Sequence, residues 1–224
     1  GGETGSPIIA LRSALGQRAV SQAAIGFLFV EKDADRAGAL QEIVDEINVP
    51  SNFEVEVARG ESFESAFGRK LNSYSARGQP LPPTFAFVDP FGWTGAPFSM
   101  IKQIMGYRSC EVLVTFMYGE INRFIGHPDQ EKNFDAFFGT SRWRQGVSIS
   151  DPQTRNRFLH DLYLDQLRQE AHAKYVRSFE MRNDRDVTDY YLFYATNNLL
   201  GLREMNEAMW KVDESGEFGF SDAT

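Results

Sequence analysis

The chain has 224 residues, a net charge of −8 and a hydrophobic fraction of 42%, which suits one well-cored domain with additions. The single cysteine, Cys110, rules out an internal disulfide framework and a multi-cysteine zinc site. We expect Cys110 to pack beside a strand rather than to act as a nucleophile. No apolar run approaches the length that crosses a bilayer, and the acidic balance argues against binding nucleic acid over the whole surface. We therefore expect a cytoplasmic protein.

Strand-like and helix-like segments alternate along the first half of the chain. Ser6 is a candidate N-cap for a first helix. Apolar residues at helical spacing predict helices between four strand-like runs. These runs cover residues 24–30, 53–58, 84–88 and 111–118. Because βαβ crossovers are right-handed and place helices on both faces of a mostly parallel sheet, the alternation predicts a doubly wound α/β fold.

The second half of the chain does not show this alternation of strands and helices. Residues 119–178 are predicted to form a helical insertion. Two alternating runs, 175–182 and 188–196, are separated by a polar turn and predict a C-terminal antiparallel hairpin at the edge of the sheet. We therefore expect a single domain over residues 1–224. The three histidines are few and scattered, so the sequence predicts no metal site.

The stretch from Thr84 to Trp93 ends a strand abruptly. Asp89-Pro90 stops the pairing because proline has no N–H, and Gly92 permits a sharp turn. If this strand is a central parallel one, Asp89 lies at its carboxyl end, where open α/β sheets bind their ligands. The alternative is that Asp-Pro only terminates the strand.

Acidic residues also follow the two preceding strands. Glu31 lies where a doubly wound domain binds ribose hydroxyls, although it could simply begin a polar loop. Glu61 and Ser62 follow the next strand, where an adenine amino group could bind, and a helix cap is an equal alternative. Glu31, Glu61 and Asp89 would then be three acids at consecutive strand ends along one edge.

Residues at the end of the strand at 111–118 and directly after it are candidates for the border of the same cleft. They are Phe116, Tyr118, Glu120, Asn122 and Arg123. Asn122 and Arg123 either orient a substrate or fix the loop.

Trp143-Arg144 pairs an aromatic residue with a cation. The pair either stacks on an unpaired base or is a buried Trp beside a solvated Arg.

The ordered set of acids resembles a class I methyltransferase that binds S-adenosylmethionine, whose terminal strand hairpin also matches this chain. In that resemblance, VDPFG stands where amino-group methyltransferases carry a D/N-P-P-Y/F motif. There the acid and the proline carbonyl accept hydrogen bonds from the target amine, and the aromatic ring stacks on the base. The resemblance implies catalytic roles for Asp89, Pro90, Phe91 and Gly92. The chain departs from the motif in having Phe91 directly after Pro90.

The sequence more specifically resembles the three-Cys-motif partner proteins, a bacterial family known mainly from genome context. The likeness covers most of the chain and is carried by GGETGSPIIAL, FVDPFGWTGAPFSMIKQIM, EVLVTFMYGEINRF and YYLFYATNNLLGLREMNEAMW. In this family the three cysteines belong to the partner protein. The resemblance implies either a methyltransferase acting on an amine, with a nucleic-acid base as one candidate acceptor, or a non-catalytic module that binds the partner.

The resemblance also implies a first strand and glycine loop upstream of Gly1. That strand would lie between the strands at 24–30 and 84–88, with ladder hydrogen bonds on both sides. Without it, both neighbours would expose unpaired backbone groups along apolar edges. We therefore expect residues 1–224 to need an upstream segment to fold.

Overall fold

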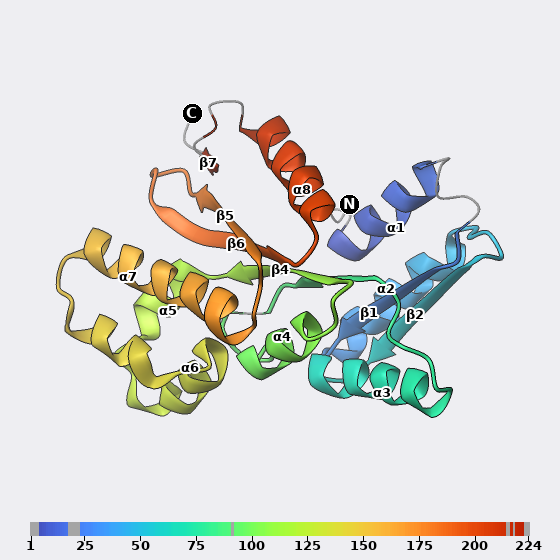
Figure 1. Ribbon diagram of the computed structural model, residues 1–224, viewed down its shortest axis with the longest axis horizontal. Helices are drawn as coiled ribbons and strands as arrows, with labels where there is room; N and C mark the ends of the chain where they lie inside the picture. The colour runs from blue at the N-terminus through green and yellow to red at the C-terminus, as the bar shows by residue number, and fades with distance from the viewer. Residues whose placement is uncertain (1–4, 18–22, 91, 214–215, 217, 222–224) are drawn as a thin grey trace. The chain divides into compact units, whose positions relative to one another are not determined.

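The computed structural model describes residues 5–17, 23–90, 92–213, 216 and 218–221 (Figure 1). The fold is mixed α/β, and the chain divides into two compact units, Gly1–Arg77 and Gly78–Thr224. Each unit has its own sheet. Within the described ranges, no helix is both long and apolar enough to cross a membrane.

The first unit is a parallel βαβ arrangement flanked by two further helices. The strands β1 and β2 run parallel, with Ile25 opposite Phe53 and Glu31 opposite Arg59. Their carboxyl ends therefore lie at one edge of the two-stranded sheet. The elements are α1 (Ser6–Gly16), β1 (Ile25–Glu31), α2 (Ala34–Glu46), β2 (Phe53–Arg59) and α3 (Phe63–Ala76).

Alternation along β2 decides which helix covers which face of this sheet. Ile8 and Leu11 of α1 pack with Val44 of α2 and Phe53 of β2 in one apolar cluster. The opposite face of β2 carries Glu56, which α3 covers through ion pairs. Arg69 and Lys70 of α3 lie 2.7 and 2.6 Å from the Glu56 carboxylate. One face is therefore held by apolar burial and the other partly by charge.

The second unit is built on a five-stranded mixed sheet in the order β3-β4-β6-β5-β7. β3 is parallel to β4, and β6 is antiparallel to both β4 and β5. Its strands are β3 (Thr84–Val88), β4 (Cys110–Phe116), β5 (Tyr175–Arg182), β6 (Thr188–Thr196) and β7 (Gly219–Ser221). Its α-helices are α4 (Phe98–Met105), α5 (Tyr118–Phe124), α6 (Glu131–Phe138), α7 (Pro152–Asp165) and α8 (Leu199–Val212). Shorter turns are the 3₁₀ helices η2 (Pro128–Gln130) and η3 (Ser141–Ser148) and the π-helical η4 (Gln166–Glu170).

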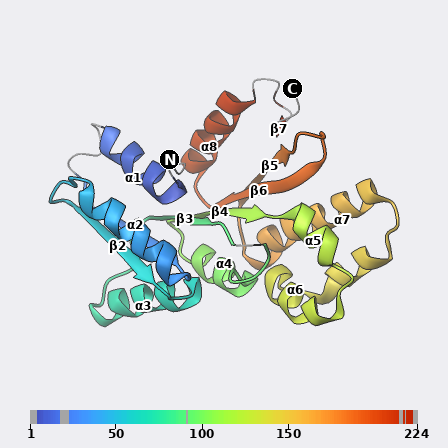
Figure 2. The same ribbon diagram turned by 180° about the vertical axis from the view of Figure 1, so that it is seen from behind.

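Helices cover both faces of this second sheet. Figures 1 and 2 show α8 on one face and α4 to α7 on the other. On the α8 side, Phe179 and Tyr194 pack against Met209. On the other side, Phe116 and Phe193 lie 5.1 and 5.2 Å, between ring centroids, from Tyr163 of α7. An aromatic core thus fixes the helices that follow β4.

Most predicted elements are confirmed, including the hairpin at 175–182 and 188–196. The strand predicted over 111–118 is too long, because it ends at Phe116 and Tyr118 begins α5. The predicted helical insertion also runs too far, since its last residues belong to β5. Ser6 is the first residue of α1 rather than its cap, which is Gly5. The doubly wound arrangement and the single domain stay predictions.

Candidate functional site

A pocket of about 670 Å³ lies in the second unit at the carboxyl end of β3. Three segments form its wall: the turn after β3, the residues around the start of α5, and Gln130 at the end of η2. We call it the Asp89 pocket. It is lined by Asp89, Pro90, Gly92, Trp93, Thr94, Met117, Glu120 and Gln130.

The turn after β3 needs glycine. Gly92 and Gly95 have φ of +76° and +87°, a conformation that side chains with a Cβ rarely adopt. Val88, the last residue of β3, is opposite Val114 of the parallel strand β4. Both strands therefore end close together, so the turn after β3 and the start of α5 share one pocket. Phe91 lies outside the described residues.

Trp93 anchors this turn to the helices. Its side chain is buried, and its ring centroid lies 4.9 Å from that of Phe134 and 5.3 Å from that of Phe124. The indole Nε1–H donates to Gln130 Oε1 at 3.3 Å, and Asn133 Nδ2 donates to the same oxygen at 2.9 Å. No sequence pattern pointed to a role for Trp93 or Gln130. An aromatic residue directly after a turn glycine was the available signal for Trp93.

Two carboxylates line the pocket without a protein partner. Asp89 is exposed at the end of β3, and Glu120 is half-buried in the first turn of α5. Within the described part of the chain, no side chain or backbone donor forms a hydrogen bond or ion pair with either carboxylate. Both are therefore available to a ligand, and the prediction that Glu120 borders the same cleft as Asp89 is confirmed.

The other predicted border residues have structural roles. Phe116 and Tyr118 are buried in the core. Arg155 of α7 donates to Asn122 Oδ1 at 3.0 Å, so Asn122 fixes the loop, as one of its two interpretations predicted. The Arg123 guanidinium lies 5.2 Å from the ring centroid of Phe124.

Glu31 lies at the carboxyl end of β1, where the sequence placed it. Its Oε1 accepts the Asp33 backbone N–H at 2.9 Å, so one carboxylate oxygen orders the loop. The second oxygen has no hydrogen-bond partner among the described residues. Glu31 therefore fits a role in binding a ribose hydroxyl.

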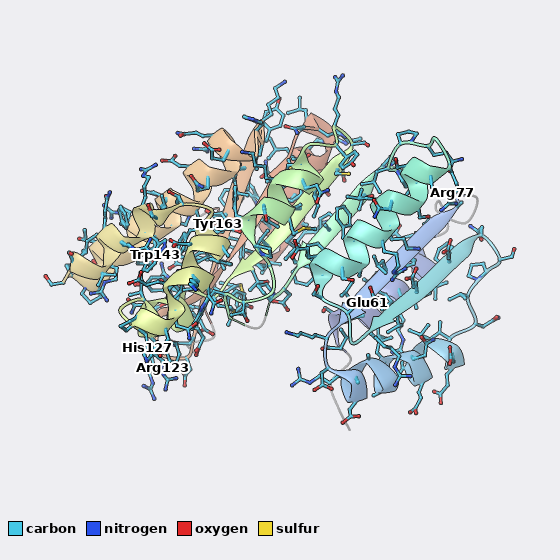
Figure 3. All side chains as sticks on the ribbon, turned by 90° about the horizontal axis from the view of Figure 1, so that it is seen from below. Glu61, Arg77, Arg123, His127, Trp143 and Tyr163 are labelled. Carbon is cyan, nitrogen blue, oxygen red and sulfur yellow. The ribbon has the colours of Figure 1, made fainter. Side chains whose placement is uncertain are left out.

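Glu61 and Ser62 fit the predicted cofactor less well. Ser62 is the N-cap of α3, where its Oγ accepts the Ser65 N–H at 3.1 Å, so the helix-cap interpretation is confirmed. Glu61, labelled in Figure 3, lies 3.2 Å from Arg69. An adenine contact would compete with both interactions. Asp89 belongs to the other unit, so a shared edge of all three acids stays a prediction.

The base-stacking hypothesis for Trp143-Arg144 is wrong. Trp143 is only 1% exposed, lies within the helical part of the second unit (Figure 3), and donates its Nε1–H to Asp135 at 2.9 Å. Arg144 covers the Trp143 ring at 4.7 Å and pairs with Asp135 at 2.6 Å. Trp143 is therefore a buried tryptophan whose ring is covered by a partly solvated arginine.

This cluster gives a pH-dependent contribution to stability. Hydrogen bonds from Arg144 hold the pKa of Asp135 below its usual value near 3.8. Its contribution is present above that value and is lost as the pH falls through the lower, folded-state pKa. We expect Asp135→Asn to lower the melting temperature at pH 7, with the difference shrinking below about pH 4. Asp184→Asn, in the exposed hairpin turn, should not change the melting temperature at any pH. A difference in melting temperature between Asp135→Asn and the wild type that stays constant at all pH values would contradict this prediction.

The cysteine and His160 have structural rather than catalytic surroundings. Cys110 is buried at the start of β4, and burial raises the pKa of its thiol. His160 Nδ1 and Nε2 lie 2.9 Å from Asp161 Oδ1 and from Ser178 Oγ, which ties α7 to β5. Within the described ranges, no group of three or more His, Cys, Asp or Glu residues could hold a metal ion.

No family model matches the sequence, no curated protein matches it, and no solved structure matches the fold.

Proposed function

We propose that the protein is an S-adenosylmethionine-dependent methyltransferase that acts on an amine. The observation that carries the proposal is an exposed carboxylate, Asp89, without a protein partner among the described residues, at the carboxyl end of a parallel strand and in the wall of a pocket. Ligands of open α/β sheets bind at such ends. The neighbouring Pro90 also lines the pocket, as the resemblance to amino-group methyltransferases requires.

The strand arrangement within each unit supports a doubly wound, methyltransferase-like fold. β1 and β2 are parallel and joined through α2, and β3 and β4 are parallel and joined through α4. The C-terminal hairpin inserts β6 between β4 and β5, antiparallel to both. These are the crossovers and the terminal hairpin that the proposed fold requires.

The roles of the residues are those that the resemblance to the methyltransferases implies. When bound, S-adenosylmethionine supplies an electrophilic methyl group on a sulfonium. Glu31 would hold a ribose hydroxyl with the carboxylate oxygen that has no partner among the described residues. Asp89 accepts a hydrogen bond from the target N–H and takes the proton that the nitrogen loses. The Pro90 carbonyl accepts a second hydrogen bond, and Trp93 keeps the turn in place.

Calorimetric titration with S-adenosylmethionine and S-adenosylhomocysteine tests the proposal. We expect binding, and we expect Glu31→Gln to weaken it by about 1.5–3 kcal/mol through the loss of charge-assisted hydrogen bonds. Glu42→Gln, on the exposed side of α2, is the matched control and should bind normally. No measurable heat at concentrations that saturate ordinary methyltransferases would rule out the cofactor.

A second function is a non-catalytic module that binds the three-cysteine-motif partner protein. The observation that favours it is the departure from the motif: Phe91 stands where the second proline is expected, and Gly92, which lines the pocket, stands where the aromatic residue is expected. Co-purification with the partner, together with full biological activity of Asp89→Ala, would support this function. Failure of the two proteins to associate would contradict it.

A further inference from the structure

The charge of the Asp89 pocket restricts the kind of amine that it can accept. Two of its eight lining residues, Asp89 and Glu120, are acids, and none of the eight is Lys, Arg or His. The remaining lining side chains are polar without charge, apolar or aromatic. Among the described residues of the wall, a ligand therefore meets two negative charges and no neutralising cation.

Two half-buried acids elsewhere in the second unit are satisfied by protein donors. Glu111 accepts hydrogen bonds from Tyr194 and Thr196 at 2.8 Å each. Asp135 is held by Arg144 and Trp143. Buried or half-buried carboxylates are normally satisfied in this way. The lack of a protein partner for either Asp89 or Glu120, within the described part of the chain, leaves their hydrogen-bonding capacity for a ligand.

The described wall has no open aromatic face for a nucleobase. Trp93 is 9% exposed and packs against Phe124 and Phe134, so a base cannot stack on it. A nucleic-acid acceptor would also bring phosphates close to Asp89 and Glu120, where like charges repel. Single-stranded nucleic acid is normally bound by cationic grooves with exposed rings. Both features are missing from the described wall of the pocket.

We propose that the Asp89 pocket binds a protonated aliphatic amine, such as a lysine side chain, through Asp89 and Glu120. The inference rests on the proposed methyl transfer and names its acceptor class. An ammonium group has three N–H donors, which matches two carboxylates and the Pro90 carbonyl. In the proposed transfer, Asp89 would take one proton from the nitrogen, and the freed electron pair would bond to the methyl group that S-adenosylmethionine supplies, leaving S-adenosylhomocysteine with the electrons of the broken carbon–sulfur bond.

The test compares probes that differ in charge. Nα-acetyl-lysine amide is the cationic probe, Nα-acetyl-norleucine amide its neutral counterpart, and adenosine and cytidine present base amino groups. Binding to the intact protein is measured by ligand-observed NMR at low salt, with saturating S-adenosylhomocysteine and without it. We expect the protein to bind the lysine probe at least about tenfold more tightly than the other three probes. Added salt should lower the affinity for the lysine probe.

Variants matched in charge separate the pocket from the general acidity of the protein. The double variant Asp89→Asn, Glu120→Gln should bind the lysine probe about tenfold or more weakly than the wild type, and each single variant should lose less affinity. Asp184→Asn with Glu207→Gln removes the same charge from exposed positions and should leave binding unchanged. Equal effects of the two pairs, or equal binding of lysine and norleucine probes, would overturn the inference.

Measurements of methyl transfer distinguish the aliphatic-amine inference from the proposed methyltransferase function. Methylation of adenosine or cytidine but not of the lysine probe would overturn the aliphatic-amine inference and leave the methyltransferase proposal standing. Binding of the lysine probe at Asp89 and Glu120 without any binding of S-adenosylmethionine would support the pocket assignment and remove the proposed function.

Discussion

Replacing Asp89 with asparagine is expected to lower the rate of amine methylation by a factor of about 10²–10⁴, the usual contribution of a positioned general base. Asparagine keeps the shape and one acceptor oxygen but cannot take up a proton. Since Asp89 is exposed and has no described protein partner, the substitution leaves no buried donor unsatisfied. The fold should therefore be unaffected.

Single-turnover transfer of labelled methyl from S-adenosylmethionine measures this effect. The expected pattern is a slower chemical step with nearly unchanged cofactor affinity. Asp184→Asn, an exposed acid in the hairpin turn, makes the same chemical change away from the pocket and should react like the wild type. A wild-type rate for Asp89→Asn would remove Asp89 from the reaction.

Gly139→Ala is expected to cause a large loss of stability, about 2–5 kcal/mol of unfolding free energy. Gly139 caps α6 with φ of +65°, which costs an L-residue about 1–2 kcal/mol. A Cβ there would also lie 2.7 Å from Cδ1 of Phe98, whose side chain is 2% exposed and packs edge-on against Tyr163. The ring has no room to move, so overpacking adds about 1–3 kcal/mol.

Urea unfolding measures this prediction against a matched glycine. Gly78 has φ of +64°, yet a Cβ there would meet nothing within 4 Å. Gly78→Ala should therefore lose only the backbone contribution, about 1–2 kcal/mol. Equal losses for the two variants would show that the contact with Phe98 carries no cost.

Helices and strands were predictable where the pattern of apolar residues and the chain-breaking residues indicate the same element and the same end. The strand at 84–88 has an apolar run and an Asp-Pro stop, and its bounds match the structure. The polar turn between β5 and β6 gave the hairpin in the same way. The strand after Cys110 was predicted too long because the apolar pattern continues through Met117 and Tyr118. Tyr118 is instead buried on a helix and donates its hydroxyl to the Pro152 carbonyl.

The candidate site was only partly predictable from the sequence. Asp89 and Glu120 were singled out because they follow neighbouring strands. The contribution of Gln130 depends on η2 bringing its amide to Trp93, a contact 37 residues apart that no local pattern encodes. For Trp143 the sequence left two interpretations open, and the buried one is confirmed. A Trp-Arg pair looks the same in sequence whether the ring is exposed or buried, and the contact with Asp135 decides it.

The most direct test of the central claim is the mass of the freshly purified protein under native conditions. We predict an added mass of one S-adenosylmethionine or S-adenosylhomocysteine per chain, present in Glu42→Gln and reduced or lost in Glu31→Gln. A bare chain that gains no mass even after incubation with excess S-adenosylmethionine would contradict the proposed methyltransferase function.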